Sequence, residues 1–227
     1  MPRILVFLAC LVITAPAFAA AGLANLSNTE ATRGLKQALA DGSAAAVAQL
    51  GAENGFLLNP KVKIPLPPVL QRVEAALRYT GMRKQADELV VAMNRAAEAA
   101  VPEAQTLLVE SVRKMSVQDA KGILTGGDTA ATDYFRRTTQ TQLTERFRPI
   151  VKKATDRVGL AEQYNGLAGQ VAQLGLIRED QSTIDGYVTQ KALDGLYLMI
   201  AEQEKAFRQN PLGATSDIVK RVFGAIR

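Results

Sequence analysis

Two polar residues on one face of a predicted helix are the first candidates for chemistry. The segment 82–101 carries apolar residues at a helical period, and Asn94 and Glu98, with Arg95 beside them, lie off that apolar stripe. Residues four apart share a helix face, so Asn94 and Glu98 could line a polar pocket or supply oxygen ligands to Ca²⁺ or Mg²⁺. The alternatives are a solvated face or helix–helix hydrogen bonds. We favour these alternatives, because charged residues off an apolar stripe are usually exposed.

A second group of candidates crowds the start of a long predicted helix, just after a Gly-Gly pair at 126–127. Its members are Asp128, Tyr134, Arg136 and Arg137. A helix N-terminus can hold an anion on its free backbone N–H groups, but we expect Asp128 to cap this helix and occupy those donors itself. The two arginines could grip a carboxylate or phosphate, or could form internal ion pairs with Glu98 or Asp194, which is the interpretation we favour.

A third candidate, Asp194, interrupts a strongly apolar predicted helix over 184–210. A buried carboxylate needs a partner, because leaving it unpaired costs about 1–3 kcal/mol or more. Tyr164, Arg136 or Arg137 could supply that partner. A two-carboxylate hydrolase built from Glu98 and Asp194 is conceivable, but nothing in the spacing favours it over a structural network. No residue is therefore assigned a catalytic or metal-binding role.

The composition excludes several kinds of chemistry. The chain has no histidine and one cysteine, Cys10, so Ser-His-Asp catalysis and histidine metal sites are ruled out. Neither a Walker A motif nor a GxGxxG motif occurs, which argues against nucleotide binding. We expect no cofactor. The net charge of +5 is spread along the chain, whereas a nucleic-acid footprint is usually clustered, so no nucleic-acid partner is expected.

The first nineteen residues have the layout of a secretory signal peptide. Arg3 precedes an uncharged apolar run, and Ala17-Phe18-Ala19 forms a small-x-small cleavage site. We expect cleavage near Ala19 and a periplasmic product that lacks Cys10 and any transmembrane segment. The remaining residues, 20–227, are long enough to form one domain.

The candidate residues must be positioned by helices. We predict an all-α, single-domain bundle of about eight or nine helices. The predicted ranges are 25–51, 69–79, 82–101, 103–115, 116–125, 128–159, 160–174, 184–210 and 217–226. Gly42 should weaken or break the first helix, and Pro149 should kink the long one. Residues 55–68 carry four prolines and alternate apolar with polar residues, which predicts a Pro-rich extended arm across the core.

Several motifs together resemble one bacterial family, the domain of unknown function DUF4197. They are NPKVKIPLP at 59–67, MNRAAEAAVPEA at 93–104, ILTGGDTAATDYFRR at 123–137, RFRPIV at 146–151 and KALDGLYLMIAEQEKAFRQNP at 191–211. The resemblance covers about residues 34–224. It implies an exported, mostly helical protein of Gram-negative bacteria and carries no activity.

Three functional hypotheses remain open. The first is a non-catalytic binding or scaffolding protein of the cell envelope that holds an apolar or amphipathic small molecule between helices. The second is an enzyme that uses Glu98, Arg136, Arg137 and Asp194, which would have to converge in one open cleft. The third is an assembly partner that offers its helix faces to another envelope protein.

Overall fold

The computed structural model describes residues 27–72, 83–159, 161–162, 164–165, 182–211 and 216–224. Within these ranges there is no strand, so the prediction of an all-α fold is confirmed. The described part contains seven α-helices and one 3-10 helix, not eight or nine helices. They are α2 (Asn28–Gly51), α4 (Arg83–Ala100), η1 (Val101–Glu103), α5 (Ala104–Lys114), α6 (Val117–Thr125), α7 (Ala130–Thr155), α9 (Ile184–Gln209) and α10 (Asp217–Gly224).

Some of the predicted features fall outside the described residues. The signal peptide over 1–19 is one of them. The helix predicted over 69–79 is described as helical up to residue 72, and most of the helix predicted over 160–174 lies outside the described ranges. None of the described helices is both long and apolar enough to cross a bilayer.

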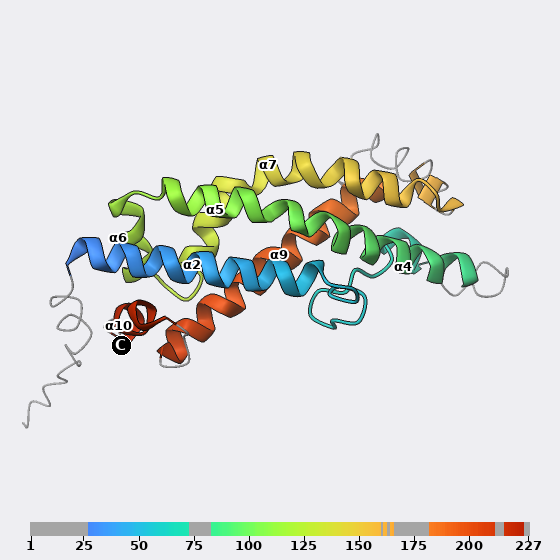
Figure 1. Ribbon diagram of the computed structural model, residues 1–227. Coiled ribbons are helices and arrows are strands. Elements are labelled where there is room, and N and C mark those ends of the chain that lie inside the picture. Colours follow the sequence, from blue (N-terminus) through green and yellow to red (C-terminus); the bar gives the residue numbers. More distant parts are fainter. Residues whose placement is uncertain are drawn as a thin grey trace, which may run out of the picture.

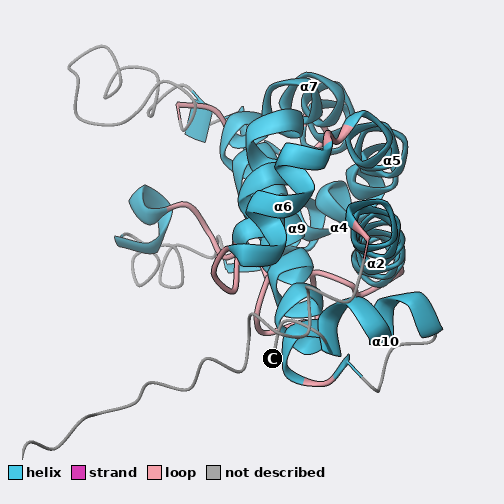
Figure 2. Cartoon of the chain, turned by 90° about the vertical axis from the view of Figure 1, so that its left-hand side faces the viewer, coloured by secondary structure: helices cyan, strands magenta, loops and turns pink. Residues whose placement is uncertain are grey.

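The helices form an elongated bundle around one continuous apolar core. In Figure 1, α4, η1 and α5 follow one another along the molecule, α7 runs beside them, and α9 runs diagonally across the bundle. The most extensive packing joins α7 to α9 and to α4, while α2 packs against α9, α5 and α10. Viewed along the bundle in Figure 2, α6 closes one end and α10 lies against α2. Fully buried side chains from most of the described helices and from residues 56–64 fill the core, including Leu35, Met93, Phe135, Phe147 and Leu196.

Local signals set most of the helix ends. The Ser27 hydroxyl accepts a hydrogen bond from the backbone N–H of Glu30, whose carboxylate bonds back to Ser27, and this capping box begins α2. Ser116 and Asp119 form the same box at the start of α6. Pro102 interrupts the helical run as predicted, and the chain passes through η1 between α4 and α5.

Gly42 and Pro149 both lie inside helices that continue past them, and at Gly42 the packing gives the reason. Gly42 does not break α2, which continues to Gly51, so that part of the prediction is wrong. A Cβ atom at position 42 would lie 3.1 Å from Cε2 of Phe207, so glycine there allows α9 to approach closely. The long helix α7 likewise continues past Pro149 to Thr155.

The Pro-rich arm packs on the core, as predicted, but it is not extended throughout: residues 53–58 and 60–62 form turns, and the stretch 63–67 runs without them. Val62, Ile64 and Leu66 are buried, whereas Lys61 and Lys63 between them are exposed. Earlier in the same segment, Phe56 is fully buried against Gly195 of α9. A Cβ atom at Gly195 would be only 2.8 Å from Cε1 of Phe56, so the glycine makes room for the aromatic ring.

Candidate functional site

The amide side chain of Asn94 binds the arm as a neighbouring strand would. Its Oδ1 accepts a hydrogen bond from the backbone N–H of Ile64 at 2.8 Å, and its Nδ2 donates to the backbone oxygen of the same residue at 2.9 Å. The second Nδ2 hydrogen is donated to the carbonyl oxygen of Val90 at 2.8 Å. Asn94 is completely buried. Its amide therefore supplies the hydrogen-bond partners that the backbone N–H and C=O groups of Ile64 would otherwise lack.

Glu98, one helical turn later, fixes the beginning of the arm. Its Oε1 accepts hydrogen bonds from the backbone N–H groups of Phe56 and Leu57, both at 3.0 Å. Its Oε2 accepts one from Nη1 of Arg95 at 2.6 Å. Burial by itself raises the pKa of Glu98, but the two amides and Arg95 outweigh it and hold the pKa below its usual value. The carboxylate is therefore charged and fully occupied at neutral pH.

Arg95 extends this network to the surface. Its Nη2 donates to the side-chain oxygen of Asn54 at 2.9 Å and lies 3.2 Å from Glu53. Asn54 has a positive φ of 68°, a left-handed conformation that asparagine adopts more readily than most residues. Together these residues form the arm clamp, which we define as Asn54, Asn94, Arg95 and Glu98.

One of the two interpretations favoured for Asn94 and Glu98, a solvated face, is wrong. Asp87 and Val91, earlier on the same face of α4, are exposed, but Asn94 is 0% and Glu98 5% exposed. The reason is that the arm packs against this half of the helix and presents backbone N–H and C=O groups to it. Polar side chains are stable there because each finds a backbone partner.

The start of α7 holds an anion, but the anion is not Asp128. Asp128 is exposed, and the N-cap residue Thr129 makes no side-chain capping bond, so the predicted cap is wrong. Glu204 of α9 is the bound carboxylate instead. It accepts hydrogen bonds from the backbone N–H groups of Ala131 and Thr132, both at 3.0 Å, and from the Thr132 hydroxyl at 3.0 Å. An internal carboxylate thus uses the free donors of the helix N-terminus.

Arg208 completes this second buried site. Its Nη2 lies 2.8 Å from Oε1 of Glu204 and also donates to the carbonyl oxygen of Ile123 at 2.9 Å. Sequence reasoning missed both residues. A signal was available, because Glu204 continues the apolar stripe four residues after Ile200, and a basic residue follows another four residues on.

Arg136 and Asp194 form the ion pair that the sequence suggested. Nη1 of Arg136 lies 3.7 Å from Oδ1 of Asp194, and the guanidinium stacks 4.5 Å from the ring centre of buried Tyr197. Asp194 also accepts a hydrogen bond from Gln190. Asp194 is only half-buried, so water also solvates its charge, and a long ion pair is enough to keep the carboxylate charged.

Arg137 points to a different partner. It lies 3.8 Å from Asp119 of α6 and 5.5 Å from the ring centre of Tyr134. The Tyr134 hydroxyl donates to the backbone oxygen of Ser111 at 2.8 Å, so this tyrosine joins α7 to α5. Neither Arg136 nor Arg137 pairs with Glu98, because Arg95 has taken that position.

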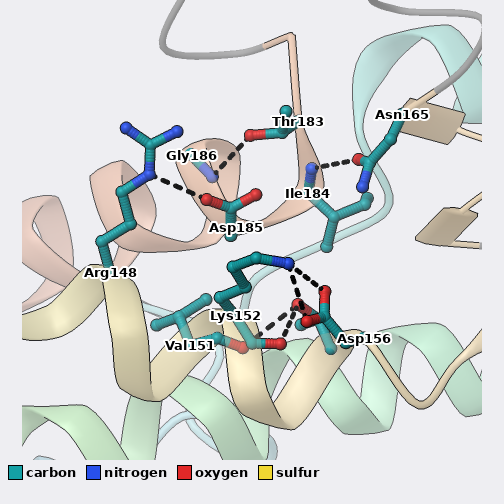
Figure 3. Close-up of polar contacts among 10 residues, drawn as sticks. Arg148, Val151, Lys152, Asp156, Asn165, Thr183, Ile184, Asp185 and Gly186 are labelled. Atoms are coloured by element: carbon teal, nitrogen blue, oxygen red, sulfur yellow. Dashed lines mark hydrogen bonds and ion pairs between the residues drawn. The ribbon is translucent and has the colours of Figure 1, made fainter.

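A third buried carboxylate, Asp185, was also missed by sequence reasoning. Figure 3 shows it on the first turn of α9, facing Arg148 of α7, whose Nε donates to it at 2.9 Å. Burial by itself raises the pKa of Asp185, but Arg148 and Thr183 outweigh it and hold the pKa below its usual value. Thr183 also caps α9 by accepting a hydrogen bond from the N–H of Gly186 (Figure 3).

Tyr164 belongs to a different part of the core, close to Tyr187. It is buried, which raises its pKa. Burial and then the nearby Tyr164 raise the pKa of Tyr187 to about 12. The Tyr187 hydroxyl donates to the carbonyl oxygen of Pro65 in the arm at 3.3 Å. Of the three partners that the sequence suggested for Asp194, Arg136 is the one that forms an ion pair with it.

The predicted site residues therefore occupy separate places in the fold. Glu98 and Asp194 share no hydrogen-bond or ion-pair partner in the described part of the chain. The described residues also contain no group of three or more acidic, histidine or cysteine side chains that could hold a metal ion. Among them, the buried side-chain polar atom without a partner is Oγ1 of Thr189.

A hollow of about 530 Å³ lies where the arm meets α4. We call it the arm hollow. The arm and α4 both contribute apolar and polar side chains to its lining. The lining residues are Leu57, Lys63, Pro65, Leu66, Gln71, Arg83, Ala86, Asp87, Val90 and Val91. Val91 is 44% exposed, and Lys63 makes no ion pair with any described residue. The volume is within the range of small-molecule sites.

Comparison with known proteins gives one result. No curated protein and no solved structure matches the chain. Residues 25–224 match the family described as Protein of unknown function (DUF4197). This match spans nearly all of the chain, including the arm, the arm clamp and the Glu204 site, and the protein therefore belongs to the DUF4197 family.

Proposed function

We propose that this protein is a non-catalytic binding or scaffolding protein of the cell envelope. The proposal rests on one observation: the buried carboxylates are occupied by structural hydrogen bonds and ion pairs. Glu98, Asp185 and Glu204 each join two distant parts of the chain, and each is matched by an arginine. A general acid or base must exchange protons near neutral pH, whereas the pKa values of Glu98 and Asp185 are held low. These groups are suited to holding the fold together.

The location in the periplasm is part of the same proposal. It is supported by the charged start, the apolar run and the small-x-small site within residues 1–19. It is also consistent with a chain that has no cysteine after that leader and so needs no particular redox environment.

The ligand in this proposal is an amphipathic small molecule with an acidic head group, bound in the arm hollow. Leu66, Ala86 and Val90 offer apolar surface there, and the ammonium group of Lys63, unpaired among the described residues, offers a positive charge. The arm clamp holds the arm in place beside α4, so this part of the wall is formed before a ligand arrives. A preformed wall lowers the entropic cost of binding.

Native mass spectrometry of protein purified from the periplasm tests the proposal. We expect the wild-type protein to retain a small-molecule adduct and the Val91→Glu variant to lose it, because a carboxylate in the lining repels an acidic ligand. Leu198→Glu is the matched control, since Leu198 is 42% exposed but lies on α9 outside the arm hollow. Clean apoprotein in repeated preparations, or an adduct that persists in Val91→Glu, would overturn the assignment.

A further inference from the structure

A second surface, far from the arm in the sequence, combines apolar and basic groups. It lies where the start of α2 meets the end of α5 and the start of α6, and we call it the α2–α5–α6 surface. Two hollows of about 100 and 430 Å³ adjoin there, and Thr32 and Val117 line both of them. Val117 is 56% exposed, although the lining also includes the buried apolar residues Ala31, Val112 and Leu124.

Basic side chains surround this apolar strip. Arg33, Lys36 and Arg113 line the larger hollow, and Lys121 lines the smaller one. None of the four has a carboxylate within ion-pair distance among the described residues. Glu30 and Asp119 bond to the serines of their own capping boxes but keep their charge; Glu30 lies near Arg33, and Asp119 pairs with Arg137. The four basic groups outnumber these two acids, so the rim carries a net positive charge around exposed apolar surface.

We propose that the α2–α5–α6 surface docks an amphipathic helical segment of a partner protein, with an apolar stripe flanked by acidic residues. The inference deepens the proposed scaffolding role and rests on it. An apolar stripe would cover Val117 and the hollows on both sides of it. Acidic residues beside the stripe would meet Arg33, Arg113 and Lys121, in the helix-in-groove mode of recognition. Because Val117 is so exposed, an extended partner face covers this strip better than a single acyl chain would.

The probe is a fluorescent synthetic helical peptide with leucines at helical spacing and glutamates on both flanks, measured by fluorescence anisotropy against the full chain. Two comparison peptides separate the contributions. One replaces every glutamate by lysine, and the other keeps the composition but scrambles the apolar stripe. We expect both to bind at least about tenfold more weakly, because one loses the charge match and the other loses the apolar face.

Variants locate the binding on the α2–α5–α6 surface. Val117→Glu should weaken binding of the acidic peptide about tenfold, since it replaces apolar contact by a like charge. It is also compatible with folding, because Val117 is exposed and an acid suits the first turn of α6. Arg113→Glu with Lys121→Glu should weaken binding by a similar factor and reduce its salt dependence. Leu198→Glu should bind like the wild type.

Several outcomes overturn the inference. If all three peptides bind equally well, or if the Val117→Glu variant binds the acidic peptide as the wild type does, the α2–α5–α6 surface is not the docking site. Val117-dependent self-association would assign it to a second copy of the chain, and Val117-dependent binding to phosphatidylglycerol vesicles without peptide binding would assign it to lipid. Failure here is distinguishable from failure of the proposed ligand site, because Val91→Glu should leave peptide binding unchanged.

Discussion

Replacement of Glu98 by glutamine tests the central structural role assigned to the arm clamp. The glutamine side chain would have nearly the same shape, but one carboxylate oxygen would become an NH₂ group. In the wild type, that carboxylate accepts hydrogen bonds from two backbone amides and from Arg95. At least one of these donors would then face another donor. We expect the arm to loosen where it joins α4.

The size of the effect follows from burial and charge. Removing one partner of a buried ion pair costs about 3–5 kcal/mol, because the remaining charge is left unmatched. Arg95 is partly exposed and keeps Asn54 and Glu53, which reduces that cost. The amide oxygen of glutamine can replace Oε1 and still accept hydrogen bonds from both Phe56 and Leu57, which leaves the NH₂ group facing Arg95. We therefore expect the free energy of unfolding to fall by about 3 kcal/mol for Glu98→Gln.

Urea denaturation measures that free energy, and amide hydrogen exchange shows where it is lost. Exchange should speed up at Phe56 and Leu57 before it does at Ile64, whose amide is held by Asn94. Glu53→Gln is the matched control. It changes the exposed acid on the same arginine and should cost less than about 0.5 kcal/mol. If Glu98→Gln unfolds at the same urea concentration as the wild type, with unchanged exchange in the arm, the clamp does not have the role described.

Three further predictions address the other buried groups. Glu204→Gln should lower the free energy of unfolding by about 3 kcal/mol and speed amide exchange at Ala131 and Thr132. The control is Glu202→Gln, which changes a more exposed ion pair with Lys61 and should change little in the same urea and exchange measurements. The folded-state pKa values of Glu98 and Asp185 lie below the ordinary 4.5 and 3.8, so their stabilising effect is complete above about pH 5 and is lost as the pH falls through the folded values. Acid titration followed by circular dichroism should accordingly show a shallower loss of stability in Glu98→Gln, and an unchanged slope would contradict this account. Thr189→Val should raise the melting temperature and increase the free energy of unfolding by up to about 1 kcal/mol, because it removes a buried hydroxyl that has no partner among the described residues. A lower melting temperature would indicate that the hydroxyl is hydrogen-bonded.

The buried carboxylates fasten parts of the chain that helices alone do not hold. Glu98 fastens the turn at the beginning of the arm, and Glu204 fastens the start of a helix, without any covalent link. Each does so by accepting hydrogen bonds from backbone N–H groups that regular secondary structure leaves free. The same two carboxylates are paired with Arg95 and Arg208, so the charge is neutralised where it is buried.

The sequence by itself determined the local architecture. The capping boxes at Ser27 and Ser116, the break at Pro102 and the alternation through the arm depend on residues a few positions apart. Such short-range interactions set helix ends and strand-like faces before any tertiary contact is made. The all-α class and the placement of the arm across the core were therefore correct.

The tertiary structure alone decided which acids are buried and what they bind. Glu98 meets amides that lie as far as 42 residues earlier, and Glu204 meets an amide 73 residues earlier. Helical periodicity marked Asn94 and Glu98 as polar and off the apolar stripe, and on that basis they were expected to face water or to bond to another helix. It cannot show that another stretch of chain will cover them with unsatisfied N–H groups, because a hydrogen bond depends on position in space and not on spacing in the sequence.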